Sequence, residues 1–317
     1  MTDRWALAID IGGTKVEGAL VDDRGALADA TRCRAATGGR ASAAELDASV
    51  LEVVDGVLDR AAAAGVSDGS IVGVGVGVAG PIDERAGTVS PINLPVWDRH
   101  PLRSVIAGRV GERLPGVRLA FHRDGVAIAL AAHWVGAARG VANMIGMVIS
   151  TGIGGGIILD GRVVTGNAGH IGQIEVSGAT GELSLGSRTT LESVASGPHT
   201  VAWARTQGWS GTTGEELAAA FAAGDAVAMR AVDRLASLVG QGVCSAAALL
   251  DVEVVAIGGG FSRVAPDLID RIGAHVARHP LDYVSRVRVV EAGLGDEAPL
   301  AGAAAFVHLA DRLPAAR

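Results

Sequence analysis

The sequence has few aromatic residues, few cysteines and no excess of positive charge, and each shortage excludes a class of protein. Only 3% of its 317 residues are aromatic, which leaves few side chains on which single-stranded nucleic acid could stack. Its cysteines, Cys33 and Cys244, cannot by themselves form a disulfide framework or a cysteine zinc site. The formal net charge of −7 argues against binding that depends on neutralising phosphates. We therefore expect no nucleic-acid partner.

The sequence pattern also argues against a secretory signal and against a membrane span. Charges at Asp3, Arg4 and Asp10 interrupt any apolar core of a signal peptide. The longest uncharged run, residues 141–159, approaches the length of a membrane span, but it contains Asn143 and several glycines. Buried strands around a glycine loop explain this run better, so we expect a cytoplasmic protein without a membrane partner.

Glycine, in contrast, is abundant. The chain has 46 glycines, about twice the ordinary usage, and they show no Gly-X-Y period. Such an excess indicates tight turns and backbone that approaches a ligand closely. With 49% hydrophobic and 19% charged residues, a chain of this length can bury a core in each of roughly two domains.

One pattern of secondary structure is predicted twice. Three strands joined by tight turns are followed by a helix and a further strand, beginning at Trp5 and again at Met144. In each copy a glycine turn follows the first strand. Helix starts are marked by capping boxes at Ser42 with Glu45 and at Thr213 with Glu216. The residues repeat poorly, so the pattern predicts two structurally related α/β halves whose glycine turns face each other across a cleft.

The first glycine turn follows a strand at Asp10–Lys15. Gly12 and Gly13 would let backbone N–H groups approach an anion, Thr14 adds a hydroxyl donor, and Lys15 adds a positive charge. Asp10 would suit a magnesium ion held through water. An ordinary hairpin turn explains the same composition, so both interpretations stay open for this turn alone.

The second turn, Ser150–Gly156, is richer in glycine and includes Thr151 and Gly152. So many glycines in so few residues indicate positive φ angles or a closely approaching ligand. Two such turns at equivalent points of two similar halves favour phosphate binding over two unrelated hairpins.

A third group, Gly75, Gly77 and Gly80, matches the dinucleotide pattern G-x-G-x-x-G, but we reject that function. Pro81 follows at once, and further prolines prevent the helix whose N-terminus would hold a pyrophosphate. Packing of a strand is the better explanation of these glycines.

Asp124 stands between a predicted strand and an apolar helix. An aspartate at this position is most often a helix cap. It also lies between the two halves, where a carboxylate could accept the proton of a substrate hydroxyl.

Taken in order, these motifs resemble the ROK family of sugar kinases and related repressors, and the resemblance spans nearly the whole chain. The segments that carry it are Asp10–Lys15, Gly77–Pro81 with Asp83, Asn93–Trp97, Asp124, Ser150–Gly156, Ala168–Gly169, Leu191–Glu192 with Ala195–Gly197, and Ile257–Gly260. The repressor branch carries an N-terminal helix-turn-helix, and the first predicted strand here begins at Trp5, so we expect the kinase branch.

The resemblance implies an actin-like, ribonuclease-H-like α/β fold of two domains that close on substrate. It implies a smaller N-terminal domain over residues 1–121, with a C-terminal helix at about 297–317 packing back on it, and a larger domain over 122–296. It also implies a homodimer.

The resemblance further implies the role of each site residue. Asp124 matches the catalytic base and Asp10 the acid that organises magnesium. The residues that match nucleotide binding are Asp10, Gly12, Gly13, Thr14, Lys15, Thr151, Gly152, Gly258, Gly259 and Gly260. Those that match the sugar side are Gly80, Asn93, Arg123, Asp124, His170, Gln173 and Glu192.

The sequence departs from the family pattern in two ways. Positions that usually hold a structural zinc are occupied by Gln173, Leu183, Leu185 and Thr190, which cannot replace a thiolate-rich shell, so we expect no zinc. His170 stands where a glutamate is usual, as it does in bacterial N-acetylmannosamine kinases, and Arg123 stands where an asparagine is usual. Both changes replace hydrogen-bond acceptors with donors around the sugar.

The sequence thus predicts an ATP- and Mg²⁺-dependent kinase of the 6-hydroxyl of a hexose. The substrate would be an amino- or N-acyl-hexose, of the N-acetylmannosamine or kanosamine type, or glucose. Two alternatives remain: a glucokinase that uses polyphosphate, and a sugar-sensing relative without catalytic activity.

Overall fold

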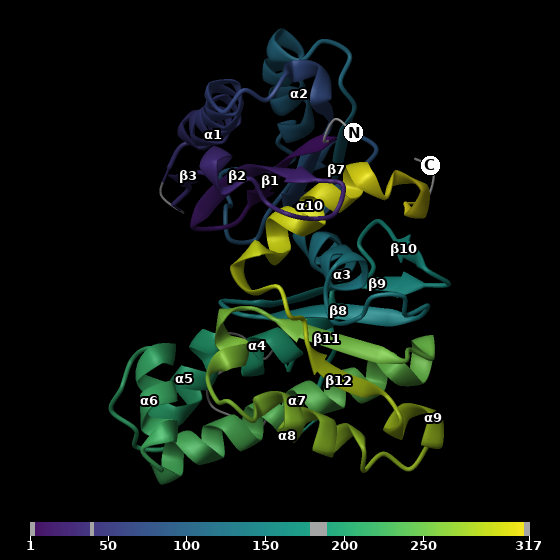
Figure 1. Cartoon of the computed structure of the whole chain (residues 1–317). Helices are drawn as coiled ribbons and strands as arrows, with labels where there is room; N and C mark the ends of the chain where they lie inside the picture. The colour runs from purple at the N-terminus through teal and green to yellow at the C-terminus, as the bar shows by residue number, and fades with distance from the viewer. Residues whose placement is uncertain (1–3, 39–40, 178–188, 314–317) are drawn as a thin grey trace. The chain divides into compact units, whose positions relative to one another are not determined.

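The computed structural model describes residues 4–38, 41–177 and 189–313, and its contacts divide the chain into two compact units. The first unit comprises Met1–Val135, Arg162–Ala168 and Asp296–Arg317, and the second comprises Gly136–Gly161 and Gly169–Gly295. Each unit is an α/β structure built on its own sheet (Figure 1).

The sheet of the first unit has the strand order β3-β2-β1-β4-β7. Its strands are β1 (Trp5–Ile11), β2 (Lys15–Asp22), β3 (Cys33–Ala36), β4 (Ile71–Val78) and β7 (Leu119–Arg123). β1, β2 and β3 pair antiparallel, whereas β1, β4 and β7 run parallel, so the carboxyl ends of these last three strands meet at one edge. A small hairpin, β5 (Ile82–Asp83) with β6 (Thr88–Val89), follows β4.

The two faces of this sheet bury side chains of different size. Leu7 and Ile9 of β1 pack in a core with the large aliphatic residues of α1 (Ala43–Ala63) and α2 (Leu102–Arg113). Ala6 and Ala8 point to the other face, against α10 (Ala298–His308). Alternation along a strand therefore gives one face for large side chains and one on which a helix can lie close to the backbone.

Glycines on β4 account for that close approach. A Cβ atom at Gly75 would lie 2.7 Å from the carbonyl carbon of Ala303, and one at Gly73 would lie 3.1 Å from Val307 Cγ2. On the helix side, Gly302 of α10 faces the backbone of α3 (Asp124–Trp134), where its Cβ would be 2.8 Å from Ala127 Cα. Gly73 and Gly75 of β4 thus serve packing, which confirms the sequence-based interpretation of Gly75.

The four strands of the second sheet that lie in the second unit repeat the arrangement of the first. They run in the order β9-β8-β11-β12, with β8 and β9 antiparallel and β8, β11 and β12 parallel. Their bounds are β8 (Met144–Ile149), β9 (Ile153–Leu159), β11 (Val254–Gly258) and β12 (Arg288–Glu291), while β10 (Arg162–Val164) belongs to the first unit. The order β2-β1-β4-β7 in the first sheet thus corresponds to the order β9-β8-β11-β12 in the second. This correspondence matches the repeat that the sequence predicts.

The helices of the second unit pack against the large side chains of its sheet. They are α4 (Leu191–Ala195), α5 (Gly197–Thr206), α6 (Gly214–Ala222), α7 (Ala226–Leu250), α8 (Leu268–Val276) and α9 (Asp282–Ser285). Leu235 and Val239 of α7 are buried in one core with Met147 of β8. The predicted capping boxes at Ser42 and Thr213 both form.

Three local features set the bounds of elements and units. α4 and α5 are separate helices that meet at Ser196, because Pro198 occupies the first turn of α5. Asp29–Thr31 forms a 3₁₀ turn before β3. The compact units divide after Val135 rather than at residue 121, because α3 packs against α10.

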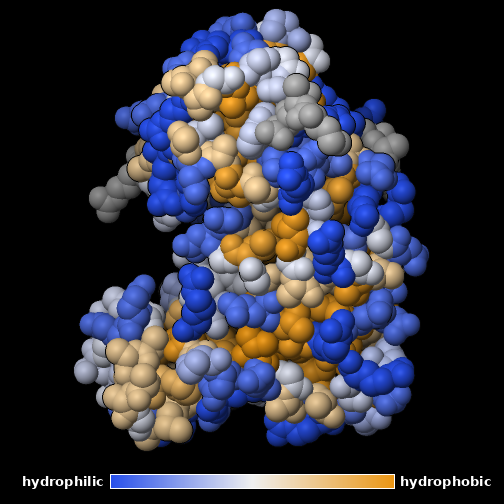
Figure 2. All heavy atoms as spheres, viewed as in Figure 1, coloured by the Kyte–Doolittle hydropathy of each residue, from blue (hydrophilic) through white to orange (hydrophobic). Residues whose placement is uncertain are grey.

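Polar side chains cover most of the helices on the face that Figure 2 shows, with hydrophobic atoms visible between them. Among the large hydrophobic side chains that the structure exposes, Ile92 and Val96 lie in the loop between β6 and α2, Met229 and Leu249 lie on α7, and Leu281 lies directly before α9. Among the described residues, no helix is both long and apolar enough to cross a membrane.

The contact between α10 and α3 gives a test of the packing argument. Gly302→Ala forces a Cβ into the backbone of Ala127, so we expect the free energy of unfolding to fall by about 1–3 kcal/mol. Gly108→Ala is the matched control, because nothing lies within 4 Å of its Cβ position in α2. That change should stabilise the helix by about 0.5–1 kcal/mol. Equal effects of the two substitutions on urea denaturation would contradict the proposed packing.

Candidate active site

Two carboxylates lie at the carboxyl edge of the parallel strands in the first unit. Asp10 is near the end of β1 and pairs in register with Gly77 of β4, while Asp124 begins α3 directly after β7. A Cβ at Gly77 would lie 3.8 Å from Asp10 Oδ1 and 3.8 Å from Asp124 Cα. The missing side chain at Gly77 therefore leaves the space that the two acidic residues share.

The electrostatics of this pair suit a cation. Enclosure by the protein raises the pKa of Asp10 from 3.8 to about 7, and the negative charge of Asp124 adds to the effect. Lys15 opposes this rise and Glu17 adds to it. A divalent cation beside the two carboxylates would relieve their repulsion, and Mg²⁺ is commonly held by one or two carboxylates and several waters. The residues present thus fit the magnesium site expected at Asp10.

The turn after Asp10 is closed by its own backbone. Gly12 N donates to Lys15 O at 2.9 Å, and Thr37 Oγ1 donates to Gly12 O at 3.0 Å. Gly13 lies under the Asn93 side chain, because a Cβ there would be 2.8 Å from Asn93 Cγ. The structure therefore brings together two of the predicted groups, the phosphate turn and the sugar-side asparagine.

Asn93 reaches the turn from a proline-rich loop that is anchored in the core. Leu94 and Trp97 are fully buried, and the Trp97 ring stacks on His100 at a centroid distance of 5.2 Å. The Gly80–Pro81 peptide, at the start of this region, is cis. Anchoring by two buried side chains explains how an irregular loop can hold Asn93 in one place.

Glu17 is a charged residue of this region that the sequence analysis did not single out. Its side chain is 3% exposed and accepts hydrogen bonds from Lys15 Nζ at 2.6 Å, Arg32 Nε at 2.6 Å and Arg34 Nη2 at 2.9 Å. Burial would raise the pKa of Glu17, but these hydrogen bonds outweigh it and lower the pKa from 4.5 to about 2. Glu17 thus holds Lys15 beside the glycine turn. A sequence signal for this cluster was available: charged residues stand two apart in Lys15 with Glu17 and in Arg32 with Arg34, on neighbouring segments, and Glu17 pairs in register with Arg34.

Arg123 is held by backbone carbonyls of the segment before Gly169. Its side chain is 2% exposed, and its guanidinium donates to Gly166 O at 3.0 Å and to Ala168 O. The same loop is held by Glu84, whose Oε1 accepts from Gly166 N at 3.4 Å and lies 3.0 Å from His122 Nδ1. Burial would raise the pKa of Glu84, but the contact with His122 keeps it below its ordinary value. Arg123 is therefore buried and anchors the segment before Gly169.

The second glycine turn, in the second unit, is closed by Glu192. Ser150 N donates to Gly152 O at 2.9 Å, and Glu192 Oε2 accepts from Ile153 N at 2.8 Å. A Cβ at Gly152 would lie 3.4 Å from the Glu192 carboxyl carbon, so this position has little room for a side chain. At Gly154, in contrast, nothing lies within 4 Å of the Cβ position.

A cavity of about 620 Å³ adjoins this turn within the second unit. It brings Thr151 together with Gly260, and Gly260 has open space at its Cβ position. Gly259, at φ +97°, passes so close to the backbone of β8 that its Cβ would be 3.0 Å from Ile149 C. Residues that the sequence analysis missed complete the lining, among them Arg205, Thr212, Phe261 and Arg263. Its size and position suit a nucleotide.

Of the other predicted sugar-side residues, Gln173 lies beside Glu192, with Gln173 Nε2 3.5 Å from Glu192 Oε1. His170 precedes the 3₁₀ turn Ile171–Gln173. This segment lies close to β9, because a Cβ at Gly172 would be 3.0 Å from Ile153 C. His170, Gln173 and Glu192 therefore belong to the second unit, whereas Asn93, Arg123 and Asp124 belong to the first.

The positions compared with a zinc site are only partly visible. Leu183 and Leu185 lie outside the described residues. Within the described ranges, no group of three or more His, Cys, Asp or Glu side chains could hold a metal ion.

Comparison with known proteins agrees with this geometry. The model of the ROK family matches residues 6–310. The chain belongs to the ROK family.

Relatives of this ROK chain include enzymes that are named for different sugars. It is 28% identical to a glucokinase of Halalkalibacterium halodurans, covering 90% of this chain and 89% of the relative. It is 33% identical to an N-acetylmannosamine kinase of Yersinia pseudotuberculosis, covering 95% and 98%.

Among solved structures, the ROK chain resembles a ROK family glucokinase from Streptomyces griseus in complex with glucose and AMPPNP. The TM-score is 0.79 at 27% identity, covering 96% of this chain and 99% of the other. The ROK chain has the actin-like, ribonuclease-H-like α/β fold that the sequence predicted.

The Glu17 cluster gives a prediction for pH dependence. Glu17→Gln should lower the free energy of unfolding by about 2 kcal/mol at pH 7, because buried charge-assisted hydrogen bonds are lost. The folded-state pKa of Glu17 is depressed, so its contribution is complete above pH 4.5 and disappears as the pH falls towards 2. The difference in stability between the two proteins should therefore shrink over that range in urea denaturation.

Glu52→Gln is the matched control, because Glu52 is exposed on α1 of the same unit. Its effect should stay within about 0.5 kcal/mol at every pH. A Glu17→Gln difference that does not change with pH would show that the charge of Glu17 contributes nothing to folding.

Proposed function

We propose that this ROK chain is an ATP- and Mg²⁺-dependent hexose kinase that phosphorylates the 6-hydroxyl of its sugar. The observation that carries the proposal is the placement of Asp124 beside Asp10 at the carboxyl edge of the parallel strands, next to the Gly12–Lys15 turn. The relatives named glucokinase and N-acetylmannosamine kinase support the same class of reaction.

Each residue has a defined role in the proposed transfer. The carboxylate of Asp124 accepts the proton of the sugar 6-hydroxyl as its oxygen forms a bond to the γ-phosphorus, and the bond to the ADP oxygen breaks. Asp10 would hold Mg²⁺ through water, and the bound cation would neutralise phosphate charge. Lys15, oriented by Glu17, adds a further positive charge at the phosphates.

The proposal assigns the nucleotide to the second unit. The cavity beside Thr151 and Gly260 is large enough for a nucleoside, and the open positions at Gly154 and Gly260 leave backbone within reach of phosphate oxygens. Gly258 and Gly259 form the end of β11 and the start of the next turn, on the adenosine side.

For the sugar, we propose a modified hexose, of the N-acetylmannosamine or kanosamine type. A neutral imidazole at His170 offers one donor and one acceptor where a glutamate would only accept, which suits an acyl carbonyl or a neutral amine. Arg123 no longer supports this choice, because its guanidinium is engaged by backbone carbonyls. The argument therefore rests on His170. Asn93, Gln173 and Glu192 remain the proposed hydroxyl contacts.

Two alternatives are retained from relatives. An inorganic polyphosphate/ATP-glucomannokinase from Arthrobacter is 25% identical with a TM-score of 0.65, so polyphosphate is kept as a second donor to be tested. A ROK family transcriptional regulator has the same fold at 21% identity, and a sensing role without catalysis would need neither Asp124 nor the second turn.

The homodimer that the sequence resemblance implies also stays a prediction.

Asp124→Asn tests the base. The variant should keep its fold and its KM for the sugar, because the two side chains are close in shape. Its kcat should fall by at least about 10²-fold, as is typical when a general base is lost. Asp23→Asn, in an exposed turn of the same unit, should leave kcat unchanged. If Asp124→Asn has near wild-type turnover at saturating sugar, Asp124 is not the general base and is only a helix cap.

His170→Glu tests the substrate. In the wild type, kcat/KM for N-acetylmannosamine or kanosamine should equal or exceed that for glucose, measured with ATP and with polyphosphate as donors. The substitution should raise kcat/KM for glucose relative to kcat/KM for the modified sugar by about 10- to 100-fold, which is the effect of one misplaced polar contact. A large preference for glucose that the substitution leaves unchanged would exclude the modified sugar while leaving the kinase assignment intact.

A further inference from the structure

A second cavity, of about 960 Å³, lies between α7 and α8 in the second unit. Its floor is made by small residues one turn apart on α7: Ala236 and Cys244 line it, and Gly240 lies between them. The His275 ring of α8 packs over Gly240, because a Cβ there would be 2.7 Å from His275 Cγ. Small residues at this spacing keep the helices close while leaving a groove beside them.

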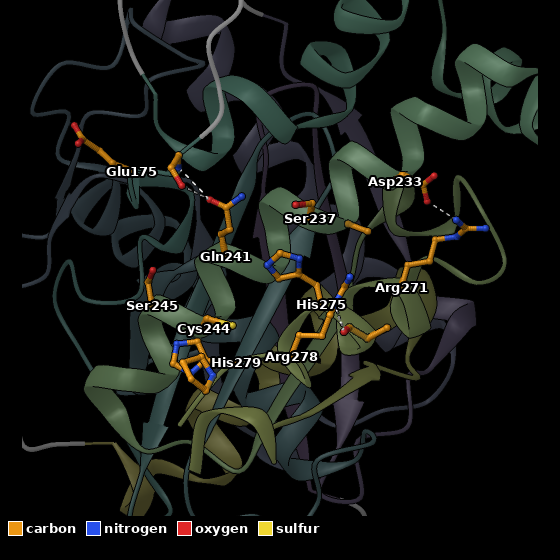
Figure 3. Close-up of a pocket in the computed structure, with 14 residues that line it drawn as sticks. Glu175, Asp233, Ser237, Gln241, Cys244, Ser245, Arg271, His275, Arg278 and His279 are labelled. Carbon is orange, nitrogen blue, oxygen red and sulfur yellow. Dashed lines mark hydrogen bonds and ion pairs between the residues drawn. The ribbon is translucent and has the colours of Figure 1, made fainter. Parts of the chain in front are cut away.

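The wall of the groove on α7 is a row of polar side chains at intervals of four residues. Ser237, Gln241 and Ser245 follow one another along one face of the helix, and all three line the cavity (Figure 3). Gln241 Oε1 accepts from Ser177 N at 3.1 Å and Ser177 Oγ at 3.0 Å, which directs the amide nitrogen of Gln241 away from Ser177. In the described parts of the chain, the hydroxyls of Ser237 and Ser245 have no hydrogen-bond partner. This wall offers hydroxyls and an amide, groups that both donate to and accept from a sugar hydroxyl.

The opposite wall carries the positive charge. Arg278 Nε donates to Ala274 O at 3.1 Å, which leaves the terminal nitrogens of its guanidinium for a ligand. His279 Nδ1 accepts from Leu281 N at 3.2 Å, so its Nε2 carries the proton and donates. His275 lies between Arg278 and Ser237 in Figure 3, and burial, together with Arg278, lowers its pKa.

The acidic residues of the groove do not cancel this charge. Asp233 and Asp267 both bind Arg271, Asp267 at 2.7 Å, so these carboxylates already have a cation. Glu175 is exposed and also lines the cavity. Among the described residues that line the groove, Arg278 is therefore the cation that no carboxylate pairs with, and it lies beside the histidines.

We propose that this groove binds a sugar phosphate, with the phosphate at Arg278, His275 and His279 and the sugar hydroxyls along Ser237, Gln241 and Ser245. The cationic wall alone would suit any small anion, and the polar wall alone any polyol. The two walls facing each other select a molecule that carries both groups. The groove is separate from the residues assigned to catalysis, and binding to it does not depend on the proposed kinase activity.

The test follows the imidazole signals of the whole protein by NMR, after ¹³C labelling of its 8 histidines. His275→Gln assigns the signal of His275, so that binding in the groove is distinguished from binding of the same ligand elsewhere. The probes are glucose 6-phosphate, inorganic phosphate and glucose. We expect glucose 6-phosphate to shift the His275 signal with a Kd below about 1 mM and to raise the titration midpoint of His275. Each of the other two probes should bind at least about tenfold more weakly.

Arg278→Gln should weaken binding of glucose 6-phosphate by at least about tenfold, because a charge-assisted hydrogen bond is lost. Arg286→Gln is the matched control: it removes the same charge from an exposed residue, paired with Asp282, that does not line the groove. That variant should bind like the wild type.

Three results would overturn the proposal. One is a His275 signal that does not saturate with glucose 6-phosphate, the result also expected if a second copy of the chain covers the groove. Another is equal affinity for inorganic phosphate, which would make the groove a general anion site. The third is unchanged affinity in Arg278→Gln. Loss of kinase activity in any assay would leave this proposal standing, because its readout is binding at His275.

Discussion

The close approach of α10 to the sheet of the first unit and to α3 is the constraint on which the packing around the candidate active site depends. It requires positions without side chains, Gly73 and Gly75 on β4 and Gly302 on α10. Asp124, the first residue of α3, directly follows β7 and therefore lies at the carboxyl edge of the sheet. Gly77, on the neighbouring strand β4, leaves room there beside Asp124 and Asp10. Glycines on one strand therefore serve both the packing of α10 and the acidic pair.

Charge at this edge is arranged in two opposed groups. Asp10 and Asp124 are like charges in an enclosed place, and the pKa of Asp10 rises to about 7 as a result. A few residues along the chain, Glu17 is surrounded by Lys15, Arg32 and Arg34, and its pKa falls to about 2. The first group is poised for a cation, whereas in the second Glu17 already has its cations and holds Lys15 in position. Function and stability thus use the same kinds of residue in different surroundings.

Family membership and specificity rest on different parts of the molecule. ROK kinases and a ROK transcriptional regulator share this fold, so the fold alone does not decide the activity. The departures of this chain from the family pattern have separate consequences. Arg123 ties the segment that ends at Ala168 to the start of α3, and it does so through backbone carbonyls that any residues at 166 and 168 would supply. His170, two residues beyond that segment, is the departure on which the proposed choice of sugar rests.

The sequence by itself determined the features that depend on neighbours along the chain. The glycine turns, the capping boxes at Ser42 and Thr213 and the repeated strand order are set by local backbone preference and by hydrophobic period, and both can be read without a structure. The family motifs added the positions of Asp10 and Asp124. Only the tertiary structure decided the rest, because it depends on residues far apart in sequence. Glu17 meets Arg34 across paired strands, Arg123 meets Gly166, and Arg205 joins Thr151 and Gly260 around one cavity. A charged side chain has the same sequence signature whether it is solvated, paired or buried, and its partner is known only when the chain has folded.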